Sequence, residues 1–478
     1  MLPESNASCC HLSYLLSPPS LTSSSYSSSS RMNLLKRLSA LLPVRRLAVA
    51  ESPPTEHVTV LIVGAGSTGL ALAQGLKKAG VPCIIVEKNP SIDAQPRDWN
   101  MGLHWGAESL RSLMPEAMWS RIQSIQVDPS TPTAESDCIK FLNGATGEVM
   151  TTVPAKKFYR LRRRKLRHLL AEGLDIQWNH RITAIKYSGD GKYATAYFDG
   201  QPSVTASLIV GADGARSMVR ELLLGPQNGR IRTVPYCATW VQARYTAEQA
   251  RFLRTFHPLY IAAINPAGFF SFFGVHDASN PDPATWTFFF YISWHSPLKE
   301  QEATKNWTNA QRLAQAKQFA QHFTDPWKSA FEWLPDDQKV WYMSLTDFDP
   351  GRDEHRWDNH DGRVTLAGDA AHAMTYQRGQ GLNHSVTDAG KLAIAIGDFI
   401  SGGKKRGDAI AEYEQEMIER AGREVRMSTT NTEMVHNWEK VLESPVFARG
   451  ITKVQNIGAA ESAATASSGK DADDRKGG

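Results

Sequence analysis

The sequence is poor in cysteine and lacks the residue spacings of the common metal sites. Its 478 residues include five cysteines, and no two of them form a Cys-x-x-Cys pair. A scattered, odd-numbered set does not build a disulfide scaffold and fits a reducing compartment. A His-Glu-x-x-His motif and paired histidines at ligand spacing are also missing. We therefore expect no metal site.

Long apolar runs and a strong net charge are absent as well. No uncharged apolar stretch reaches the roughly 18 residues that a membrane-spanning helix needs. The 53 Lys and Arg residues nearly balance the 49 Asp and Glu residues, which leaves a net charge of +4. That charge is too weak and too evenly spread for a nucleic-acid surface. With 41% hydrophobic residues, the chain can bury a core, so we expect a globular cytoplasmic enzyme.

The two ends differ in composition from the rest of the chain. Residues 1–31 are mostly serine, proline and small residues, and the first acidic residue, Glu4, has no companion before position 51. This composition is typical of a disordered extension, and a mitochondrial transit peptide shares it. We expect residues 1–57 to be a disordered or targeting extension. Residues 458–478 should form a disordered tail.

A glycine-rich turn joins an apolar strand to a helix. Residues 58–63 form a β-branched run typical of a buried parallel strand, and a Gly-x-Gly-x-x-Gly motif follows directly. Gly64 would permit the tight turn, Gly66 would let the backbone approach a pyrophosphate, and Gly69 would let the helix pack on the strand. A second strand leads to Glu87, which can accept hydrogen bonds from ribose hydroxyls. This frame predicts an adenine dinucleotide site.

Two more glycine turns follow predicted strands further along the chain. Residues 208–210 lead to an Asp-Gly pair at Asp213, and residues 363–367 lead to a Gly-Asp pair at Asp369. A Gly-x-Gly-Leu-Asn turn at residues 379–383 then opens a helix with apolar residues at helical spacing. Taken alone, Asp369 is equally well explained as a helix cap or a turn residue, and Asp213 as part of an ordinary turn.

Together these motifs resemble the single-component FAD-dependent aromatic hydroxylases, the para-hydroxybenzoate hydroxylase-like or group A flavin monooxygenases. The three motifs of that family are GxGxxG, a DG motif and a GD motif. They occur here in order at Gly64, Asp213 and Asp369, and the resemblance covers about residues 58–400. The runs at 96–99 and 378–384 look like a fungal subset tied to secondary metabolism.

The resemblance implies non-covalently bound FAD, with NADPH or NADH and O2 as co-substrates. In the family the GD aspartate contacts the ribityl chain of FAD, and the DG aspartate lies near FAD and the nicotinamide path. The helix after the Gly-x-Gly turn would direct its positive end toward the flavin. No single side chain is expected to be an indispensable catalytic group. The expected cofactor-binding residues are Gly64, Gly66, Gly69, Glu87, Arg97, Gly102, Arg163, Asp213, Gly368, Asp369, Gly379, Gly381, Leu382 and Asn383.

Basic side chains crowd residues 156–168. Leu166, Leu169 and Leu170 lie at helical spacing, which predicts a helix with one apolar stripe. A solvated basic face explains the charge without any ligand. The family, however, has an Arg-x-x-Leu helix whose arginine contacts FAD, and Arg163 with Leu166 matches that spacing.

Aromatic, β-prone segments fill residues 236–300 and predict a sheet. In the family this middle sheet covers the substrate, and a flat apolar molecule would suit such a wall. A plain aromatic core explains any single ring equally well. The chain departs from the family after residues 368–372, where a proline usually follows. Ala373 and Met374 stand there instead, which leaves the pocket shape and the substrate open.

These observations predict an α/β fold in which a Rossmann-like FAD-binding domain is interleaved with a mixed β-sheet substrate domain, with a helical C-terminal region. The predicted function is FAD-dependent, NAD(P)H-using oxygenation of a small aromatic or polyketide-like molecule, by hydroxylation or epoxidation, in secondary metabolism. Two alternatives are an FAD-dependent dehydrogenase or reductase without oxygenation, and a non-catalytic flavin-binding protein. The expected segments are the FAD-binding domain at 58–230, the substrate sheet at 231–355, the GD segment at 356–400 and C-terminal helices at 401–457.

Overall fold

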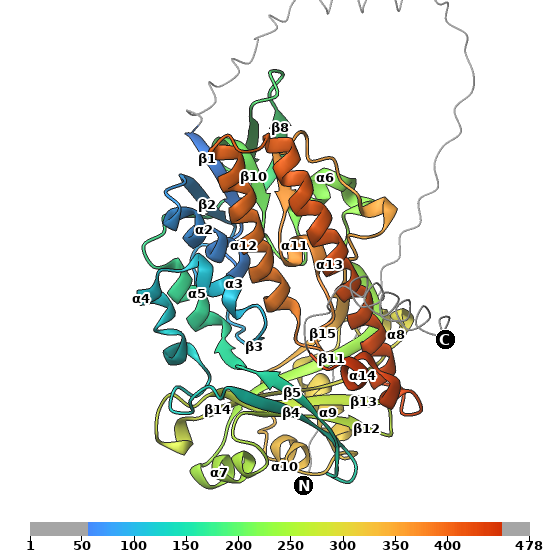
Figure 1. The fold of residues 1–478 in the computed structure, drawn as a ribbon. Helices are drawn as coiled ribbons and strands as arrows, with labels where there is room; N and C mark the ends of the chain where they lie inside the picture. The colour runs from blue at the N-terminus through green and yellow to red at the C-terminus, as the bar shows by residue number, and fades with distance from the viewer. Residues whose placement is uncertain (1–55, 452–478) are drawn as a thin grey trace, which may run out of the picture. The chain divides into compact units, whose positions relative to one another are not determined.

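The computed structural model describes residues 56–451 (Figure 1). The expected N-terminal extension lies outside the described residues except for Glu56 and His57, which begin the first strand. The expected C-terminal tail lies outside them as well. Within the described range, no helix combines the length and the apolar character that crossing a membrane requires.

The first sheet carries the predicted dinucleotide turn. Its strands run in the order β7-β2-β1-β10-β9-β8, and β16 also pairs with β10. Pairing is parallel among β7, β2, β1, β10 and β16, and antiparallel where β9 meets β10 and β8. Its strands are β1 (Glu56–Val63), β2 (Cys83–Glu87), β7 (Ile176–Trp178), β8 (Ile182–Tyr187), β9 (Ala194–Phe198), β10 (Gln201–Gly211) and β16 (Val364–Leu366).

Helices cover this sheet because its central strands are apolar on both faces. Leu61 and Ile62 are neighbours in β1, so their side chains point to opposite faces, and both are fully buried. Their core includes α2 (Ser67–Lys78), α12 (Gly381–Ile400) and α13 (Arg406–Val435). Figure 1 shows α12 and α13 side by side along the sheet. The strands and helices expected around the three glycine turns are confirmed.

The second sheet is the predicted aromatic one. Its order is β15-β11-β14-β13-β12-β4-β5, antiparallel throughout except for the β4–β12 pair. The sheet is therefore mixed, as expected, although β4 and β5 come from the segment assigned to the FAD-binding domain. The strands are β4 (Ser136–Asn143), β5 (Val149–Lys156), β11 (Arg232–Arg244), β12 (Tyr260–Asn265), β13 (Phe269–Asp277), β14 (Thr287–His295) and β15 (Val340–Asp347).

Alternation along β14 separates the two faces of this sheet. Phe288 and Phe290 pack with helices α7 (Ala247–Thr255), α9 (Asn309–Ala320) and α10 (Trp327–Glu332) on one face. Phe289 and Tyr291 point to the other face, toward the first sheet, where they line a cavity. One run of aromatic residues therefore contributes both to the hydrophobic core under the helices and to the wall of the cavity.

A two-stranded ribbon connects the two sheets. It pairs β3 (Asn100–Leu103) with β6 (Tyr159–Arg162), and β6 runs directly into α5 (Arg163–Ala171). The helix predicted from the leucine spacing is confirmed, because Leu166, Leu169 and Leu170 are all buried. The remaining helices are α3 (Ala107–Leu113), α4 (Glu116–Trp119), α6 (Met218–Asn228), α8 (Leu298–Ala303), α11 (Asp369–His372) and α14 (Pro445–Arg449).

Candidate functional site

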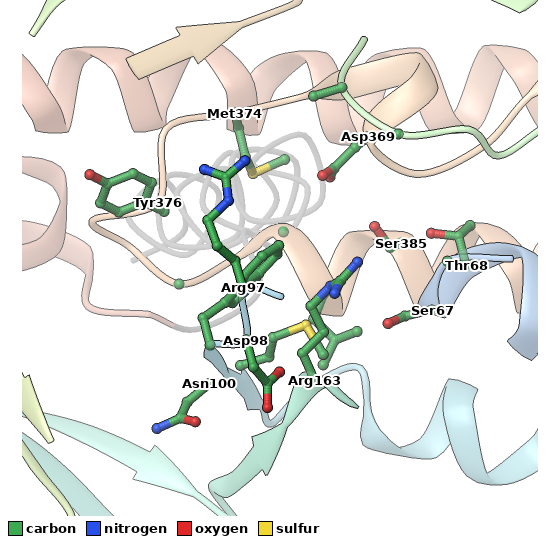
Figure 2. A pocket seen from close by; sticks show the side chains of 18 of the residues that line it. Ser67, Thr68, Arg97, Asp98, Asn100, Arg163, Asp369, Met374, Tyr376 and Ser385 are labelled. Atoms are coloured by element: carbon green, nitrogen blue, oxygen red, sulfur yellow. The ribbon is translucent and has the colours of Figure 1, made fainter. Parts of the chain in front are cut away.

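A cavity of about 680 Å³ is lined by residues of both sheets and of the ribbon between them. One part is bounded by the three glycine turns, and the other by aromatic side chains of the second sheet. Figure 2 shows Asp369 and Arg163 directed into the same space, with Ser67, Thr68 and Ser385 beside them. Most expected cofactor-binding residues line it: Gly64, Gly66, Glu87, Arg97, Gly102, Arg163, Asp213, Asp369, Gly379, Gly381 and Leu382.

The dinucleotide turn has the geometry that its glycines were expected to allow. Gly64 has a φ of +115°, and a Cβ atom there would lie 2.4 Å from the carbonyl oxygen of Ala212. A Cβ on Gly69 would lie 2.1 Å from the carbonyl oxygen of Gly64. Gly69 does not line the cavity, so its part is to bring the helix close to the turn. A Cβ on Gly66 would make only an ordinary contact, at 3.9 Å from the carbonyl oxygen of Ala212, and Gly66 lines the cavity.

Glu87 ends β2 at the cavity and is buried. Its Oε2 atom accepts a hydrogen bond from the backbone N–H of Ala65 at 2.9 Å, and its Oε1 atom accepts one from the backbone N–H of Asn89 at 3.1 Å. Arg167 holds the same turn from α5, since its Nε donates to the carbonyl oxygen of Ala65 at 3.1 Å. Arg167 is 4% exposed, so part of the basic segment is buried structure and not a solvated face.

Asp369 supplies a carboxylate that receives no hydrogen bond from the described residues. It follows Gly368 at the start of α11 and accepts no side-chain hydrogen bond within residues 56–451. Burial raises the pKa of Asp369, while the charges of His372 and Arg163 oppose that rise. A carboxylate in this position fits hydroxyl donors of a ligand. The residues present therefore suit the ribityl chain of FAD.

The Gly368–Asp369 turn is fixed from behind by a buried ion network. Asp388 of α12 accepts hydrogen bonds from Gly368 N at 2.8 Å and His372 Nε2 at 2.5 Å, and Arg420 Nη2 donates to its other oxygen at 2.7 Å. Burial alone would raise the pKa of Asp388, but His372 and Arg420 hold it well below its usual range. Gly368 does not line the cavity. A Cβ there would lie 2.4 Å from Thr68 Oγ1, so Gly368 permits the close approach of the two turns.

The amino end of α12 reaches the cavity. Its first residues, Gly381 and Leu382, line the space together with Gly379, so unpaired N–H groups of the first turn face a ligand there. Asn383 is fully buried and lies behind the wall. Its Oδ1 accepts from the backbone N–H of His104 at 2.9 Å, and its Nδ2 donates to the Gly102 carbonyl oxygen at 3.1 Å. Asn383 therefore positions β3 and does not touch the cavity.

Asp213 is engaged by its own helix. Oδ1 accepts a hydrogen bond from Ser217 at 2.5 Å and Oδ2 accepts one from the backbone N–H of Met218 at 2.7 Å, which caps α6. Burial raises the pKa of Asp213, and these bonds oppose the rise. These contacts give Asp213 a structural role at the start of α6, which neither the FAD assignment nor an ordinary turn anticipated. Sequence reasoning missed Arg220, which is fully buried and donates to the carbonyl oxygens of Ala215 and Ala370 at 2.7 and 2.8 Å.

The run at 96–99 holds the cavity edge to the ribbon and to the second sheet. Arg97 is exposed at the cavity (Figure 2). Asp98 is 4% exposed in its side chain and pairs with Arg162 at 3.1 Å and with His276 of β13 at 3.4 Å. Burial would raise the pKa of Asp98, but His276 and Arg162 lower it well below its usual range. Asp98 thus ties the ribbon to the second sheet.

Aromatic rings packed at tilted and edge-to-face angles form the far wall. The ring centroid of Trp240 lies 4.0 Å from that of Tyr291 and 4.7 Å from that of Tyr376. Met374, which stands near the family's proline position, lines the cavity beside Asp369 (Figure 2). Tyr376 was not expected at the site. It lies in a loop, and nothing in the sequence around it indicates that its side chain lines a cavity.

Comparisons with known proteins agree with this site. The sequence profile described as "FAD binding domain" matches residues 57–428. FAD-dependent monooxygenase cctM of Talaromyces islandicus is 36% identical over 400 residues, which cover 84% of this chain and 98% of that protein. FAD-dependent monooxygenase phnB of Penicillium herquei is 36% identical over 403 residues, which cover 83% and 95%.

Solved structures share the fold at low sequence identity. HpxO of Klebsiella pneumoniae, crystallised with FAD and uric acid, aligns with a TM-score of 0.63 at 17% identity, over 85% of this chain and 95% of that one. The 2,6-dihydroxypyridine-3-hydroxylase of Arthrobacter nicotinovorans aligns with a TM-score of 0.63 at 16% identity, over 81% and 94%. The sequence match over most of its length shows that the chain belongs to the FAD-binding-domain family and is an FAD-dependent monooxygenase.

Proposed function

We propose that the enzyme inserts one atom of O2 into an aromatic or polyketide-like small molecule, by hydroxylation or epoxidation, in a pathway of secondary metabolism. NADPH or NADH supplies the two electrons. The balanced reaction converts substrate, O2, NAD(P)H and a proton into oxygenated product, water and NAD(P)⁺. The fungal source of the 36%-identical relatives supports this setting.

One observation carries the proposal: a single cavity joins the dinucleotide turn and Asp369 to an aromatic wall. In this assignment Gly64, Gly66 and Glu87 lie at the adenosine and pyrophosphate part of FAD. Asp369 accepts hydroxyl hydrogen bonds from its ribityl chain. The aromatic wall on the second sheet then faces the remaining space, where a flat substrate has rings to stack on.

FAD, reduced by the nicotinamide cofactor, supplies the activation of O2 and the transfer of one oxygen atom. The protein supplies position, charge and exclusion of water. The amino end of α12 places N–H groups and a positive dipole end at the cavity, where they stabilise negative charge on a ligand. The dipole contributes on the order of 1 kcal/mol, so it tunes the cofactor and does not create the reaction. Trp240, Phe289 and Tyr291 keep water from the reacting ring.

The test is NADPH-driven oxygen uptake by the purified, flavin-loaded protein, with and without a panel of phenolic and polyketide aromatics. We expect one compound class to stimulate uptake and to yield a product that carries a single ¹⁸O atom from ¹⁸O2 by mass spectrometry. Substrate oxidation without ¹⁸O incorporation would instead identify a dehydrogenase. Bound FAD that NADPH and NADH never reduce would identify a flavin-binding protein without turnover.

A further inference from the structure

Arg160 is a buried guanidinium without an anionic partner. It lies on β6 opposite Gly102, and 8% of the residue is exposed. Within residues 56–451 its side chain forms no ion pair and donates no hydrogen bond, and its Nε atom is buried and unpartnered. A buried charge without a partner is strongly destabilising, and proteins usually pair it or avoid it. Its presence here therefore needs an explanation.

Aromatic rings hold the guanidinium in place but do not neutralise it. The Cζ atom of Arg160 lies 4.7 Å from the ring centroid of Phe272 and 5.9 Å from that of Tyr260. Such contacts stabilise a cation by less than its desolvation on burial costs. Burial lowers the pKa of Arg160 to about 10, so the group stays charged at neutral pH. All three residues line the cavity.

Two more buried polar groups of the aromatic wall face the same space. Trp240 Nε1 and the Tyr376 hydroxyl are buried, belong to residues that line the cavity, and lie close enough to each other that the Trp240 group opposes the rise in the pKa of Tyr376. Burial raises the pKa of Tyr376 well above its usual value, so its hydroxyl remains a donor. Of the carboxylates in the cavity lining, Glu87, Asp213 and Asp369 lie at the flavin end, and Asp98 is already paired with Arg162 and His276. The aromatic end therefore offers donors and a positive charge.

We propose that Arg160 binds an anionic oxygen of the substrate, so that the enzyme selects aromatic molecules carrying an ionised acidic group, either a carboxylate or a phenolate. The proposal rests on the proposed function, because it takes the aromatic end of the cavity as the substrate site. A guanidinium presents two parallel N–H donors to a carboxylate, or one or two to a phenolate oxygen. The Tyr376 hydroxyl donates to a neutral oxygen of the same molecule.

Matched pairs of probes test the charge requirement on the FAD-loaded protein by equilibrium dialysis. The carboxylate arm compares 2-naphthoate with 2-naphthamide, and the phenolate arm compares 4-nitrophenol above its pKa with 4-nitroanisole. A charge-assisted hydrogen bond is worth about 1.5–3 kcal/mol, which corresponds to roughly 10- to 100-fold in Kd. We expect at least one anionic probe to bind roughly tenfold or more tightly than its neutral partner. If the tenfold difference in Kd appears in only one arm, that arm shows whether the substrate group is a carboxylate or a phenolate.

Variants test whether the ratio of the Kd of the neutral probe to that of the anionic probe depends on Arg160. Arg160→Met should reduce it to about one, Arg160→Lys should retain part of it, and Arg111→Met should leave it unchanged. Arg111 is an exposed arginine paired with Glu116 outside the cavity lining. Equal binding of both members of every pair by the wild type, including no binding of any, would overturn the proposal. So would an Arg160→Met variant that keeps the ratio.

Two further readouts separate this proposal from its alternatives. A structural role for Arg160 predicts that Arg160→Met lowers Tm. An unpaired buried charge kept for ligand binding predicts a Tm equal to or above that of the wild type, because methionine keeps the stem packed on the rings. Probe binding is an equilibrium measurement that needs neither NADPH nor O2. Failure of oxygen incorporation with the charge preference intact would therefore reject the proposed function alone.

Discussion

Two aspartates follow glycine turns at the cavity, and their surroundings give them different tasks. Asp213 accepts hydrogen bonds from Ser217 and Met218 at the start of α6. Asp369 accepts none within the described part of the chain and faces the cavity. A carboxylate that already accepts hydrogen bonds from its own helix can accept few more from a ligand. A carboxylate without such bonds can use both oxygens to bind the ligand.

Asp369→Ala should weaken FAD binding without unfolding the protein. Loss of hydrogen bonds to a charged acceptor costs about 1.5–3 kcal/mol, which corresponds to a roughly 10- to 100-fold higher Kd for FAD. Flavin fluorescence titration of the apoprotein measures the Kd, and circular dichroism checks the fold. Asp398→Ala, a change at an exposed carboxylate near the end of α12, is the control. Full FAD occupancy in Asp369→Ala would contradict the assignment.

At this scale the sequence identified the motifs but not the state of each side chain. Gly64, Glu87 and Asp369 line the cavity as expected, because local turn chemistry determines where they lie. Local sequence could not predict that Asn383 lies behind the cavity wall or that Arg160 lines the cavity. Whether a polar side chain faces a cavity, a backbone or water depends on elements distant in the sequence.

Among the elements, α2 owes its position to a glycine at the turn. A Cβ on Gly69 would lie 2.1 Å from the Gly64 carbonyl oxygen, and backbone cannot yield as a side chain can. Gly69→Ala should therefore destabilise the protein by about 1–3 kcal/mol and reduce its bound flavin. Thermal unfolding and the ratio of flavin to protein absorbance measure the two effects.

Gly397→Ala in α12 is the matched control, and we do not expect it to destabilise the protein. A Cβ there meets nothing within 4 Å, so Gly397→Ala should be neutral or stabilise by up to about 1 kcal/mol through helix propensity. If Gly69→Ala behaved like Gly397→Ala, the close packing of α2 on the turn would not be required for the fold.

The Asp98 clamp predicts a linkage between the ribbon and the second sheet. Asp98→Asn keeps the shape of the side chain but removes the charge that faces Arg162 and His276. Breaking a buried pair in this way should lower the free energy of unfolding by about 2–4 kcal/mol, read from urea denaturation. Asp93→Asn, at a half-exposed carboxylate beside His168, should change it by less than about 1 kcal/mol. An equal change in the free energy of unfolding for both variants would show that Asp98 contributes no more to stability than a half-exposed carboxylate does.

Element types follow from local patterns, but their pairing does not. The β-branched run before Gly64 and the leucine spacing after Arg163 each predicted the element that forms. The aromatic run in β14 indicated a strand, and its alternation gives the two faces. The pairing of β4 with β12 joins residues far apart in the sequence. No local signal marks such a contact, so the domain boundary near residue 230 did not anticipate it.

At the scale of the whole molecule, the two sheets meet around one cavity because each presents a different chemistry to it. The first sheet ends in glycine turns and helix N-termini, which suit phosphate and hydroxyl groups. The second presents aromatic rings and the Tyr376 hydroxyl, which suit an oxygen-bearing aromatic molecule. Family membership indicates the flavin, while the substrate wall depends on side chains such as Met374 and Arg160 that the family motifs do not include.

Buried histidines predict how the stability of the whole protein depends on pH. Burial lowers the pKa of His104 and of His436 from 6.5 to about 4. His436 stays neutral between the Thr432 carbonyl oxygen at 2.6 Å and Ser293 Oγ at 2.9 Å. Below pH 6.5 the unfolded chain binds protons that the folded chain does not. These histidines therefore stabilise the fold fully above pH 6.5, and that contribution is lost as pH falls to about 4.

Urea denaturation between pH 7.5 and about 4.5 measures this dependence. We expect the free energy of unfolding to fall as pH is lowered through the range from 6.5 to 4, by on the order of 1–3 kcal/mol for each buried histidine. His436→Asn removes one titrating group, so its profile should be flatter than that of the wild type whatever its absolute stability. His57→Asn, at an exposed histidine in β1, should keep the wild-type slope. A His436→Asn profile parallel to that of the wild type would show that His436 is protonated in the folded protein, and the neutral hydrogen-bonded state would then be wrong.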